Sequence, residues 1–365
     1  MTRVAVIGGG YGGITVARAL DSVAEVVLIE QKDQFVHHAA ALLALVDRAW
    51  AEAVFMPYDN LLTNGRVCIG TVLKIEGNRI HIVGQEPLEA DYIVIATGSS
   101  YPFPSKYTNT STELSRLQLA QLHVDLEGTS RALLVGGGPV GLEMAGSLKS
   151  TFPSIEVVVL EHHDQILADD SYTNEFREMV EQQAIEMGIT LIVGDTLAEL
   201  PPIQPATLGH FEVQTIGGRV LEADMWFQCH GSRPATGFLR SSNYRDAINP
   251  DGTLKVRPTL QLVGHDHVYA IGDVTDIPET KRADAARRHA QVTVANLVEQ
   301  LEGRQPSHTY VPNVNWMVLP LGPTHGASQL IDNRGNARVV GAAHTAAIQT
   351  DSLMLSKVRA QLNLD

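Results

Sequence analysis

The chain has 365 residues, enough for about two domains of ordinary size, and its 27 basic and 41 acidic residues give a formal net charge of −14. With 44% hydrophobic and 19% charged residues, it has the composition of a folded globular protein, which excludes extensive disorder. The acidic balance argues against nonspecific nucleic-acid binding, no apolar run reaches the length of a transmembrane span, and two isolated cysteines cannot form a disulfide framework.

The first elements are a predicted strand, a glycine-rich turn and a helix. Residues 3–7 predict the strand, residues 14–20 the helix, and residues 25–29 a second strand that ends at Glu30. The turn has the spacing GxGxxG and contains Gly8, Gly10, Tyr11, Gly12 and Gly13. The first glycine of such a turn permits the bend, the second lets the backbone approach a pyrophosphate, and the third lets the helix pack on the strand. Because an acid about 20 residues further on accepts ribose hydroxyls, this segment predicts a dinucleotide site.

The same pattern recurs in the second third of the chain. A predicted strand over residues 131–135 precedes a second GxGxxG turn, a helix over residues 142–149 and a strand over residues 156–160 that ends at Glu161. The turn contains Gly136, Gly138, Pro139, Val140 and Gly141. Two ordinary strand–helix turns are the alternative reading, but two copies with matching acids support each other. They suggest one site for FAD and one for NAD(P)H.

Three further segments fit this pairing. Residues 92–95 predict a strand that ends in a small-residue turn at Ala96, Thr97 and Gly98. Residues 225–234 repeat that pattern around Gly231, and a strand from residue 268 ends at Gly272 and Asp273. A long helix is expected from about residue 281 to residue 301.

The order GGGxGG, ATGS, GGGxxGxE and YAIGD resembles that of the two-dinucleotide-domain flavoproteins, which are FAD- and NAD(P)-dependent oxidoreductases. This family includes type II NADH dehydrogenases, apoptosis-inducing factors and disulfide reductases. Within it the chain is most similar to the ferroptosis-suppressor branch, through residues 32–43, 140–145, 289–296 and 356–359. The resemblance extends over essentially the whole chain.

The resemblance implies an α/β fold with two Rossmann-like dinucleotide-binding domains and a small C-terminal segment. We expect residues 1–105 and 245–303 to form the FAD domain in two pieces. Residues 106–244 form the inserted NAD(P)H domain, and residues 304–365 form an interface near the flavin, with homodimerisation as one of its uses.

The resemblance also implies roles for single residues. Glu30, followed by Gln31 and Lys32, binds the adenosine ribose of a non-covalent FAD, and Asp273 accepts from its ribityl chain; a helix-capping or turn aspartate is the alternative. Glu161 does for NADH what Glu30 does for FAD. A carboxylate there repels a 2′-phosphate, so NADH is preferred, while His162 and His163 leave NADPH open.

Four side chains are candidates for catalysis, each with a structural alternative. Glu143 reaches the flavin and nicotinamide region in the family, or is an acid stabilised by a helix dipole. His37 and His38 precede the apolar run of residues 39–46 and orient a quinone, or are core histidines. Lys357 has a matching lysine in the branch, and Lys281 is a cofactor-binding candidate that shares one helix face with Asp284 and Arg288.

Missing motifs narrow the chemistry. A redox CxxxxC is absent, so thiol chemistry is disfavoured, and no metal site is predicted. The glutamine pair by which type II NADH dehydrogenases contact quinone is replaced by residues 283–288, which puts a respiratory role in doubt. The apolar side chains of residues 316–321 form a quinone pocket or ordinary core. A C-terminus with Leu353, Met354, Leu355 and Val358 but little basic charge is a poor membrane anchor.

The leading hypothesis is an FAD-dependent NADH:quinone oxidoreductase with a small quinone or aromatic acceptor. The alternatives are a tailoring or carrier-protein reductase and an NADH-sensing flavoprotein of the apoptosis-inducing-factor type. A strand that starts at residue 3 leaves no space for a signal peptide, and Thr2 offers no myristoylation acceptor. We therefore expect a cytoplasmic protein, with peripheral membrane contact left open.

Overall fold

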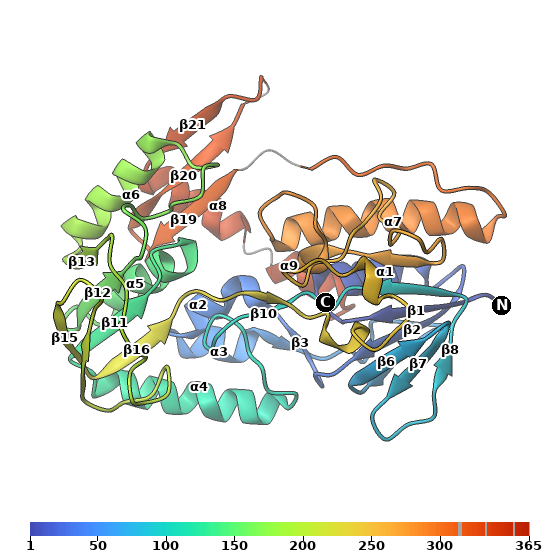
Figure 1. Ribbon diagram of the computed structural model, residues 1–365, viewed down its shortest axis with the longest axis horizontal. Coiled ribbons are helices and arrows are strands. Elements are labelled where there is room, and N and C mark those ends of the chain that lie inside the picture. Colours follow the sequence, from blue (N-terminus) through green and yellow to red (C-terminus); the bar gives the residue numbers. More distant parts are fainter. Residues whose placement is uncertain (313–315, 333, 353–354, 365) are drawn as a thin grey trace.

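The computed structural model describes residues 1–312, 316–332, 334–352 and 355–364, so the predicted roles of Leu353 and Met354 lie outside the described residues. Two parallel sheets dominate the chain (Figure 1). The first has the strand order β18-β9-β1-β2-β5 and the second the order β13-β12-β11-β16. The predicted class, α/β with two Rossmann-like units, is confirmed.

Four of the five strands of the first sheet are apolar and buried on both faces, and only the edge strand β5 is largely exposed. Its members are β1 (Arg3–Ile7), β2 (Glu25–Glu30), β5 (Arg66–Ile69), β9 (Tyr92–Ile95) and β18 (Val268–Ala270), all paired in parallel. Continuous apolar runs are typical of strands covered on both sides, and Val4, Ala5 and Val6 are fully buried. Helices α1 (Tyr11–Leu20) and α7 (Ala283–Leu301) pack against each other on one face.

The second sheet repeats this construction. Its strands are β11 (Arg131–Val135), β12 (Glu156–Leu160), β13 (Ile189–Ile192) and β16 (Met225–Gln228), again all parallel. Its helices are α4 (Thr112–Glu127), α5 (Pro139–Thr151) and α6 (Asn174–Glu186). Helix α5 follows β11 as α1 follows β1, so the repeat in the sequence is a repeat in space.

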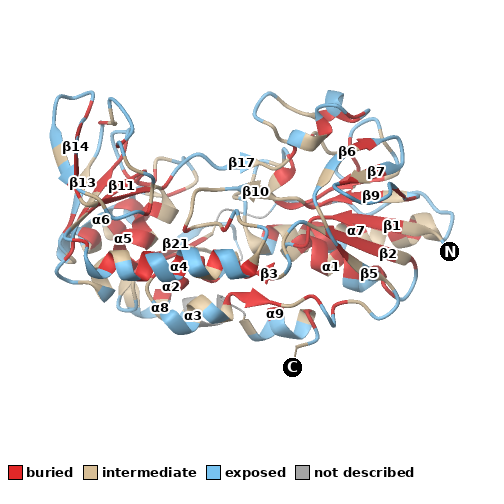
Figure 2. Ribbon diagram, turned by 90° about the horizontal axis from the view of Figure 1, so that it is seen from below, coloured by how far each residue is buried: buried red, intermediate tan, exposed pale blue. Residues whose placement is uncertain are grey.

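Two short strands join the halves. Strand β10 (Ser99–Ser100) pairs antiparallel with β17 (Arg233–Pro234), and Figure 2 shows the pair between the two sheets. The predicted domain limits at residues 105 and 244 stay predictions. Beyond β17, Leu239 and Tyr244 belong to the same core cluster as Ile75 and Ile80 of the first half.

The C-terminal segment contacts both halves. The antiparallel sheet of β19 (Met317–Leu321), β20 (His325–Ile331) and β21 (Ala337–Val340) packs with α8 (Ala342–Ser352) against α5 and α6. A Cβ on Gly146 of α5 would lie only 2.4 Å from the Leu321 Cα, so helix and strand touch backbone to backbone. Helix α9 (Leu355–Gln361) lies instead on α1.

Short elements complete the fold. They are β3 (Phe35–Val36), η1 (His38–Ala40), α2 (Ala41–Ala44), α3 (Arg48–Ala53), β4 (Phe55–Met56), β6 (Val72–Glu76), β7 (Arg79–Ile82), β8 (Leu88–Glu89), β14 (Phe211–Gln214), β15 (Val220–Ala223), η2 (Gly237–Leu239), η3 (Arg245–Ala247) and η4 (Gly272–Val274). Across the described ranges, no helix is both long and apolar enough to cross a membrane.

Two predictions about α7 need correction, namely its start and the helix face assigned to Lys281. Helix α7 begins at Ala283 because Arg282 is extended, so Lys281 precedes the helix and shares no helix face with Asp284 and Arg288. Those two residues do form an ion pair of 3.1 Å across one turn.

The apolar runs at residues 39–46 and 316–321 contribute to the hydrophobic core, which for the second run was the alternative to a quinone pocket. Leu42 and Leu45 pack into one cluster with Leu319 and Leu321, and Leu45, Leu319 and Leu321 are fully buried. Of the candidate pocket residues, Met317 belongs to the same cluster, while Trp316 lies beneath the guanidinium of Arg282.

Candidate functional site

The first glycine turn is closely packed at its two ends and open in its middle. Gly8 has a φ of +107°, and a Cβ there would lie 2.4 Å from the Ala96 carbonyl oxygen. A Cβ on Gly13 would lie 1.8 Å from the Gly8 carbonyl oxygen, whereas a Cβ on Gly10 would meet nothing within 4 Å. The chain itself therefore requires glycine at both ends, while the space over Gly10 is free for a ligand that approaches the backbone.

The carboxylate of Glu30 is held against this turn. It accepts from the Gly9 N–H at 2.5 Å and from the Lys32 N–H at 2.9 Å. The Tyr58 hydroxyl donates to the Gly9 carbonyl oxygen at 2.9 Å and steadies the same peptide. Gln31 is exposed beside them.

The second turn reproduces the first closely. A Cβ on Gly136 would lie 2.7 Å from the Cys229 carbonyl oxygen and one on Gly141 2.0 Å from the Gly136 carbonyl oxygen, while Gly138 again has open space. Glu161 accepts from the Gly137 N–H at 2.6 Å and from the His163 N–H at 2.9 Å. The two halves thus present the same loop and the same carboxylate in equivalent positions.

The ionised state of Glu161 is favoured by its surroundings. Burial raises the pKa of this carboxyl, but the hydrogen bonds from His163 and Gly137 outweigh burial and lower the pKa overall. A permanent negative charge at this position favours hydroxyls over a phosphate.

The long helices differ in how their N-termini are capped. Helices α4 and α6 are capped by the side chains of Ser111 and Thr173. Helices α1, α5 and α7 begin at Gly10, Gly138 and Arg282 without a side-chain cap. Their first N–H groups are therefore available to an anionic group, as in dinucleotide-binding helices. The open glycines and these uncapped termini fit FAD and a nicotinamide dinucleotide.

Asp273 lies at the end of the first sheet, next to a lysine that the sequence did not single out. Lys106 Nζ lies 3.1 Å from Asp273 Oδ2, and the Ser99 hydroxyl donates to the same oxygen at 2.6 Å. Burial raises the pKa of Asp273, while Lys106 and Ser99 lower it more strongly, so the carboxylate is ionised. Lys106 also donates to the Ser99 carbonyl oxygen and so ties the β10 linker to Asp273.

Glu143 is a carboxyl without a stabilising partner. It lies on α5 five residues after the Gly138 cap, and no hydrogen bond or ion pair reaches it from the described residues. Burial raises its pKa to about 7. At neutral pH this group can therefore either hold or release a proton.

His37 and His38 have different environments. His37 is buried, and its Nδ1 lies 2.8 Å from the Tyr11 hydroxyl, which accepts from the Ala39 N–H. This arrangement favours donation from Tyr11 to Nδ1 and hence the Nε2 tautomer. Burial raises the pKa of Tyr11, and the Arg287 guanidinium lies 4.7 Å from the centre of its ring.

His38 stacks on Tyr107, with 6.2 Å between ring centroids, and its buried Nδ1 has no hydrogen-bond partner in the described part of the chain. Burial, followed by the charges of Lys106 and Lys32, holds the pKa of His38 well below its usual range. His38 is thus a neutral imidazole with an unused nitrogen, under the influence of the charges of Lys106 and Lys32.

The two candidate lysines are both exposed, and they differ in their hydrogen bonds. Lys281 donates to the carbonyl oxygens of Thr275 and Ile277 at 2.9 and 2.7 Å, and burial lowers its pKa. Lys357 is exposed on α9, and no contact joins it to the glycine turns within the described residues.

The remaining candidates lie in turns after strands. Three of the glycines, Gly98, Gly231 and Gly272, have left-handed backbones. The Thr97 hydroxyl donates to the Ala235 carbonyl oxygen at 2.8 Å.

A buried network behind Gly272 escaped the sequence analysis. The Gly272 N–H donates to His289 Nδ1 at 2.9 Å, and His289 Nε2 lies 2.7 Å from Glu279 Oε1. The Tyr310 hydroxyl donates to Glu279 Oε2 at 2.7 Å. Burial lowers the pKa of His289 to about 4 despite Glu279, so a neutral histidine supports the Gly272–Asp273 turn. The sequence signal was only the position of His289 on the helix after that turn.

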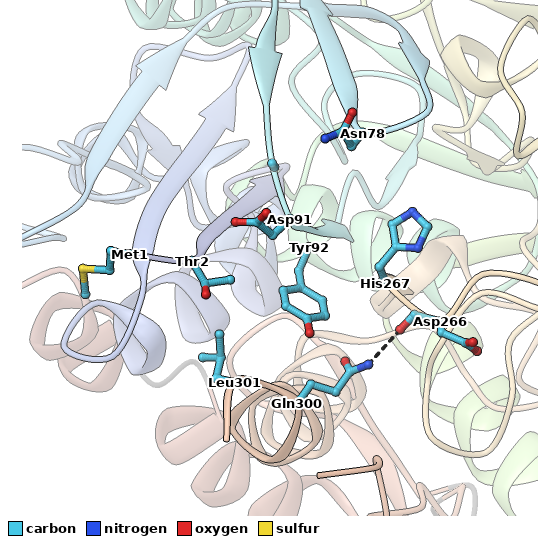
Figure 3. Close-up of a pocket in the computed structure, with 10 residues that line it drawn as sticks. Met1, Thr2, Asn78, Asp91, Tyr92, Asp266, His267, Gln300 and Leu301 are labelled. Atoms are coloured by element: carbon cyan, nitrogen blue, oxygen red, sulfur yellow. Dashed lines mark hydrogen bonds between the residues drawn. The ribbon is translucent and has the colours of Figure 1, made fainter. Parts of the chain in front are cut away.

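A surface hollow lies at the opposite end of the first sheet, where its strands begin (Figure 3). Its walls include Thr2 before β1, Tyr92 at the start of β9 and His267 before β18. Gln300 donates to the Asp266 carbonyl oxygen at 3.0 Å on its rim. Ligands of open α/β sheets bind at the carboxyl ends of the strands, so this hollow is not the dinucleotide site.

Two dinucleotide loops at the carboxyl ends of two parallel sheets define a flavin- and pyridine-nucleotide-dependent oxidoreductase. The family model for pyridine nucleotide-disulphide oxidoreductases matches residues 2–295, and the chain belongs to this family. Its cofactors are accordingly FAD and NAD(P)H. Both cysteines are free and buried, so the disulphide of the family name has no counterpart here.

Ferroptosis suppressor protein 1 of Taeniopygia guttata is 32% identical over 364 residues, which cover 97% of this chain and 94% of the relative. Two solved structures share the fold. The sulfide:quinone oxidoreductase of Aquifex aeolicus has a TM-score of 0.77 at 17% identity. The match covers 99% of this chain and 92% of that protein. NDH2 of Plasmodium falciparum in complex with NADH has a TM-score of 0.77 at 12% identity. The match covers 100% of this chain and 97% of NDH2. The predicted family and oxidoreductase class are confirmed.

Proposed function

We propose that this protein oxidises NADH and reduces a small quinone-type acceptor, with non-covalent FAD as the resident cofactor. The observation that carries the proposal is the duplicated loop, in which Glu30 and Glu161 accept from Gly9 and Gly137 in the same way. When bound, FAD accepts a hydride from NADH and passes the electron pair to the acceptor. The names of the two structural neighbours, one with quinone and one with NADH, support this pair of substrates.

The first loop holds the cofactor. The uncapped N-terminus of α1 binds the pyrophosphate over Gly10, and Glu30 accepts from the adenosine ribose. Asp273, ionised beside Lys106, accepts from ribityl hydroxyls, and the N-terminus of α7 stabilises negative charge at the flavin. Ala96, Thr97 and Gly98 form the turn after β9 at the same end of the sheet and would contact the bound cofactor there.

The second loop binds the reductant. Gly138, with Pro139 and Val140 in the first turn of α5, offers its uncapped N-terminus to the pyrophosphate of NADH, and Glu161 accepts from the adenosine ribose. Because Glu161 stays ionised, a 2′-phosphate is disfavoured and NADH is the preferred nucleotide. Gly231, with its left-handed backbone in the turn after β16, stays a candidate for contact with the nucleotide.

Glu143 supplies the proton that quinone reduction consumes. The overall reaction, NADH + H⁺ + quinone → NAD⁺ + hydroquinone, consumes one proton. A carboxyl with a pKa of about 7 can deliver this proton and recover another from solvent at neutral pH. His38 keeps its imidazole neutral and Lys357 is exposed, so we assign neither the proton step and keep both as candidates for contact with the acceptor.

The test is an anaerobic visible spectrum of the FAD-loaded protein, recorded before and after addition of NADH and then of a short-chain quinone. Flavin absorption that bleaches with NADH and returns with quinone is expected. Bleaching without return would reject the quinone and favour another acceptor. A protein that neither contains nor takes up FAD would overturn the proposal altogether.

We further propose a cytoplasmic homodimer. The free, buried state of Cys68 and Cys229 is consistent with a reducing compartment. In the described part of the C-terminal sheet, β21 pairs only with β20, and an unpaired strand edge is a surface to which a second copy can add. Light scattering should give twice the chain mass, and a monomer would reject the dimer. Co-flotation with liposomes tests peripheral membrane contact.

A further inference from the structure

Two histidines follow directly after Glu161 and converge on its carboxylate. His162 Nδ1 lies 2.9 Å and His163 Nδ1 2.7 Å from the same oxygen, Glu161 Oε1. The centroids of the two imidazole rings are 3.6 Å apart, and the ligand atoms of all three residues lie within 4.8 Å of one another. Two imidazole nitrogens and a carboxylate oxygen at one point are a ligand set of transition metals.

The carboxylate of this cluster is already fixed in place. The Gly137 N–H holds Oε2 at 2.6 Å and the His163 N–H holds Oε1 at 2.9 Å, and the Glu161 side chain is only 7% exposed. The side chains of His162 and His163 are 65% and 53% exposed. An ion can thus reach a preorganised oxygen from the solvent side, next to two imidazoles whose Nδ1 atoms already lie against it.

The distances indicate which metals fit. The nitrogen and oxygen donors are 2.7 or 2.9 Å apart. For a metal about 2.0–2.1 Å from each donor, these separations correspond to a nitrogen–metal–oxygen angle of about 80–90°. Tetrahedral coordination needs about 109°, or a donor separation of roughly 3.3 Å at the same bond lengths. The cluster therefore favours the right-angled geometry of Cu²⁺ and Ni²⁺ over the tetrahedral geometry of structural Zn²⁺.

We propose that Glu161, His162 and His163 form a binding site for a divalent transition metal, Cu²⁺ or Ni²⁺, and that this metal and NADH exclude each other. A metal on Oε1 occupies the lone pairs to which a ribose hydroxyl would donate. The exclusion rests on the proposed role of Glu161 toward NADH, while the metal site itself does not. The site would make NADH oxidation sensitive to free transition metal.

The first experiment measures metal binding without nucleotide. Tag-free, FAD-loaded protein is titrated with NiCl₂ by calorimetry, and its Cu²⁺ complex is examined by electron paramagnetic resonance. We expect one ion per chain and nitrogen hyperfine coupling from imidazole. His162→Asn and His163→Asn should each weaken binding by at least about tenfold.

The matched control is His210→Asn. His210 Nδ1 lies 3.2 Å from Asp224 Oδ1, and this side chain is 62% exposed, so it is a similar histidine–carboxylate pair without a second imidazole. This variant should bind Ni²⁺ as the parent protein does. Binding that both single variants retain at full strength, or an absence of binding to the parent protein, would overturn the site.

The second experiment tests the exclusion with Ni²⁺, because reduced flavin could itself reduce Cu²⁺. Added Ni²⁺ should raise the KM for NADH with little change in kcat, EDTA should restore it, and the double variant His162→Asn/His163→Asn should not respond. Tight Ni²⁺ binding with an unchanged KM would refute the exclusion. Failure of NADH to reduce the flavin in metal-free protein would instead refute the proposed function and leave the metal titration valid.

Discussion

Replacing Glu143 by Gln removes a carboxyl whose ionisation the folded protein disfavours. Burial raises its pKa from the model-peptide value of 4.5 to about 7. At 1.36 kcal/mol for each unit of pKa, the ionised form costs the folded state about 3 kcal/mol once both states are deprotonated. The parent protein should lose this stability progressively as the pH rises from about 4.5 to about 7, because there the folded state binds the extra proton. The amide variant has no such loss.

The assay is thermal unfolding of both proteins at saturating FAD from pH 5 to pH 8.5. The Tm of Glu143→Gln relative to the parent should rise across this range and level off above pH 7. The control is Glu178→Gln, an exposed acid on α6, which should follow the parent at every pH. A Tm difference that does not vary with pH, or one that favours the parent at high pH, would refute the assignment of a strained carboxyl. In turnover the same variant should slow the reduction of quinone, the half-reaction that consumes the proton, as measured by stopped-flow reoxidation of the flavin.

Four further substitutions test the binding loops and the Lys106–Asp273 pair. Gly10→Ala meets no protein atom and should preserve Tm while FAD content falls at least about tenfold, whereas Gly13→Ala, which would clash with Gly8, should lower Tm as measured by calorimetry. Glu161→Gln should raise the KM for NADH and shift the ratio of NADPH to NADH turnover toward NADPH, with FAD content unchanged; an unaltered ratio would remove Glu161 from nucleotide selection. Lys106→Met should raise the pKa of Asp273, so that FAD release on acidification, followed by fluorescence, begins at a higher pH than in the parent protein.

The parts of the site that sequence analysis predicted are the local ones. The glycine turns and the acids that follow them lie within about 25 residues of each other, and their spacing reflects backbone geometry alone. The Lys106–Asp273 pair joins residues 167 positions apart, so no local pattern reveals it. The Glu279–His289–Tyr310 network likewise depends on the return of the C-terminal segment to the first half.

The local sequence determines neither the exact start of α7 nor the partner of an apolar run, for a related reason. Basic residues at 281 and 282 fit a helical pattern, but Arg282 is extended and the helix begins one residue later. Leu42 and Leu45 of the apolar run at residues 39–46 pack against α5 of the other half, a contact that hydropathy along the chain does not distinguish from a ligand pocket. Periodicity indicates that a face is buried without indicating what covers it.

The first sheet also has a consequence for synthesis of the protein. Its edge strand β18, at Val268–Ala270, pairs with β9, which ends at Ile95, so the whole second sheet is translated before the first can be completed. At about 5–20 residues per second, β9 waits roughly 10–35 s on the ribosome with one side unpaired. An unpaired apolar strand is a template for association with other chains. The nascent protein therefore depends on rapid folding of the inserted unit, or on a chaperone, during that interval.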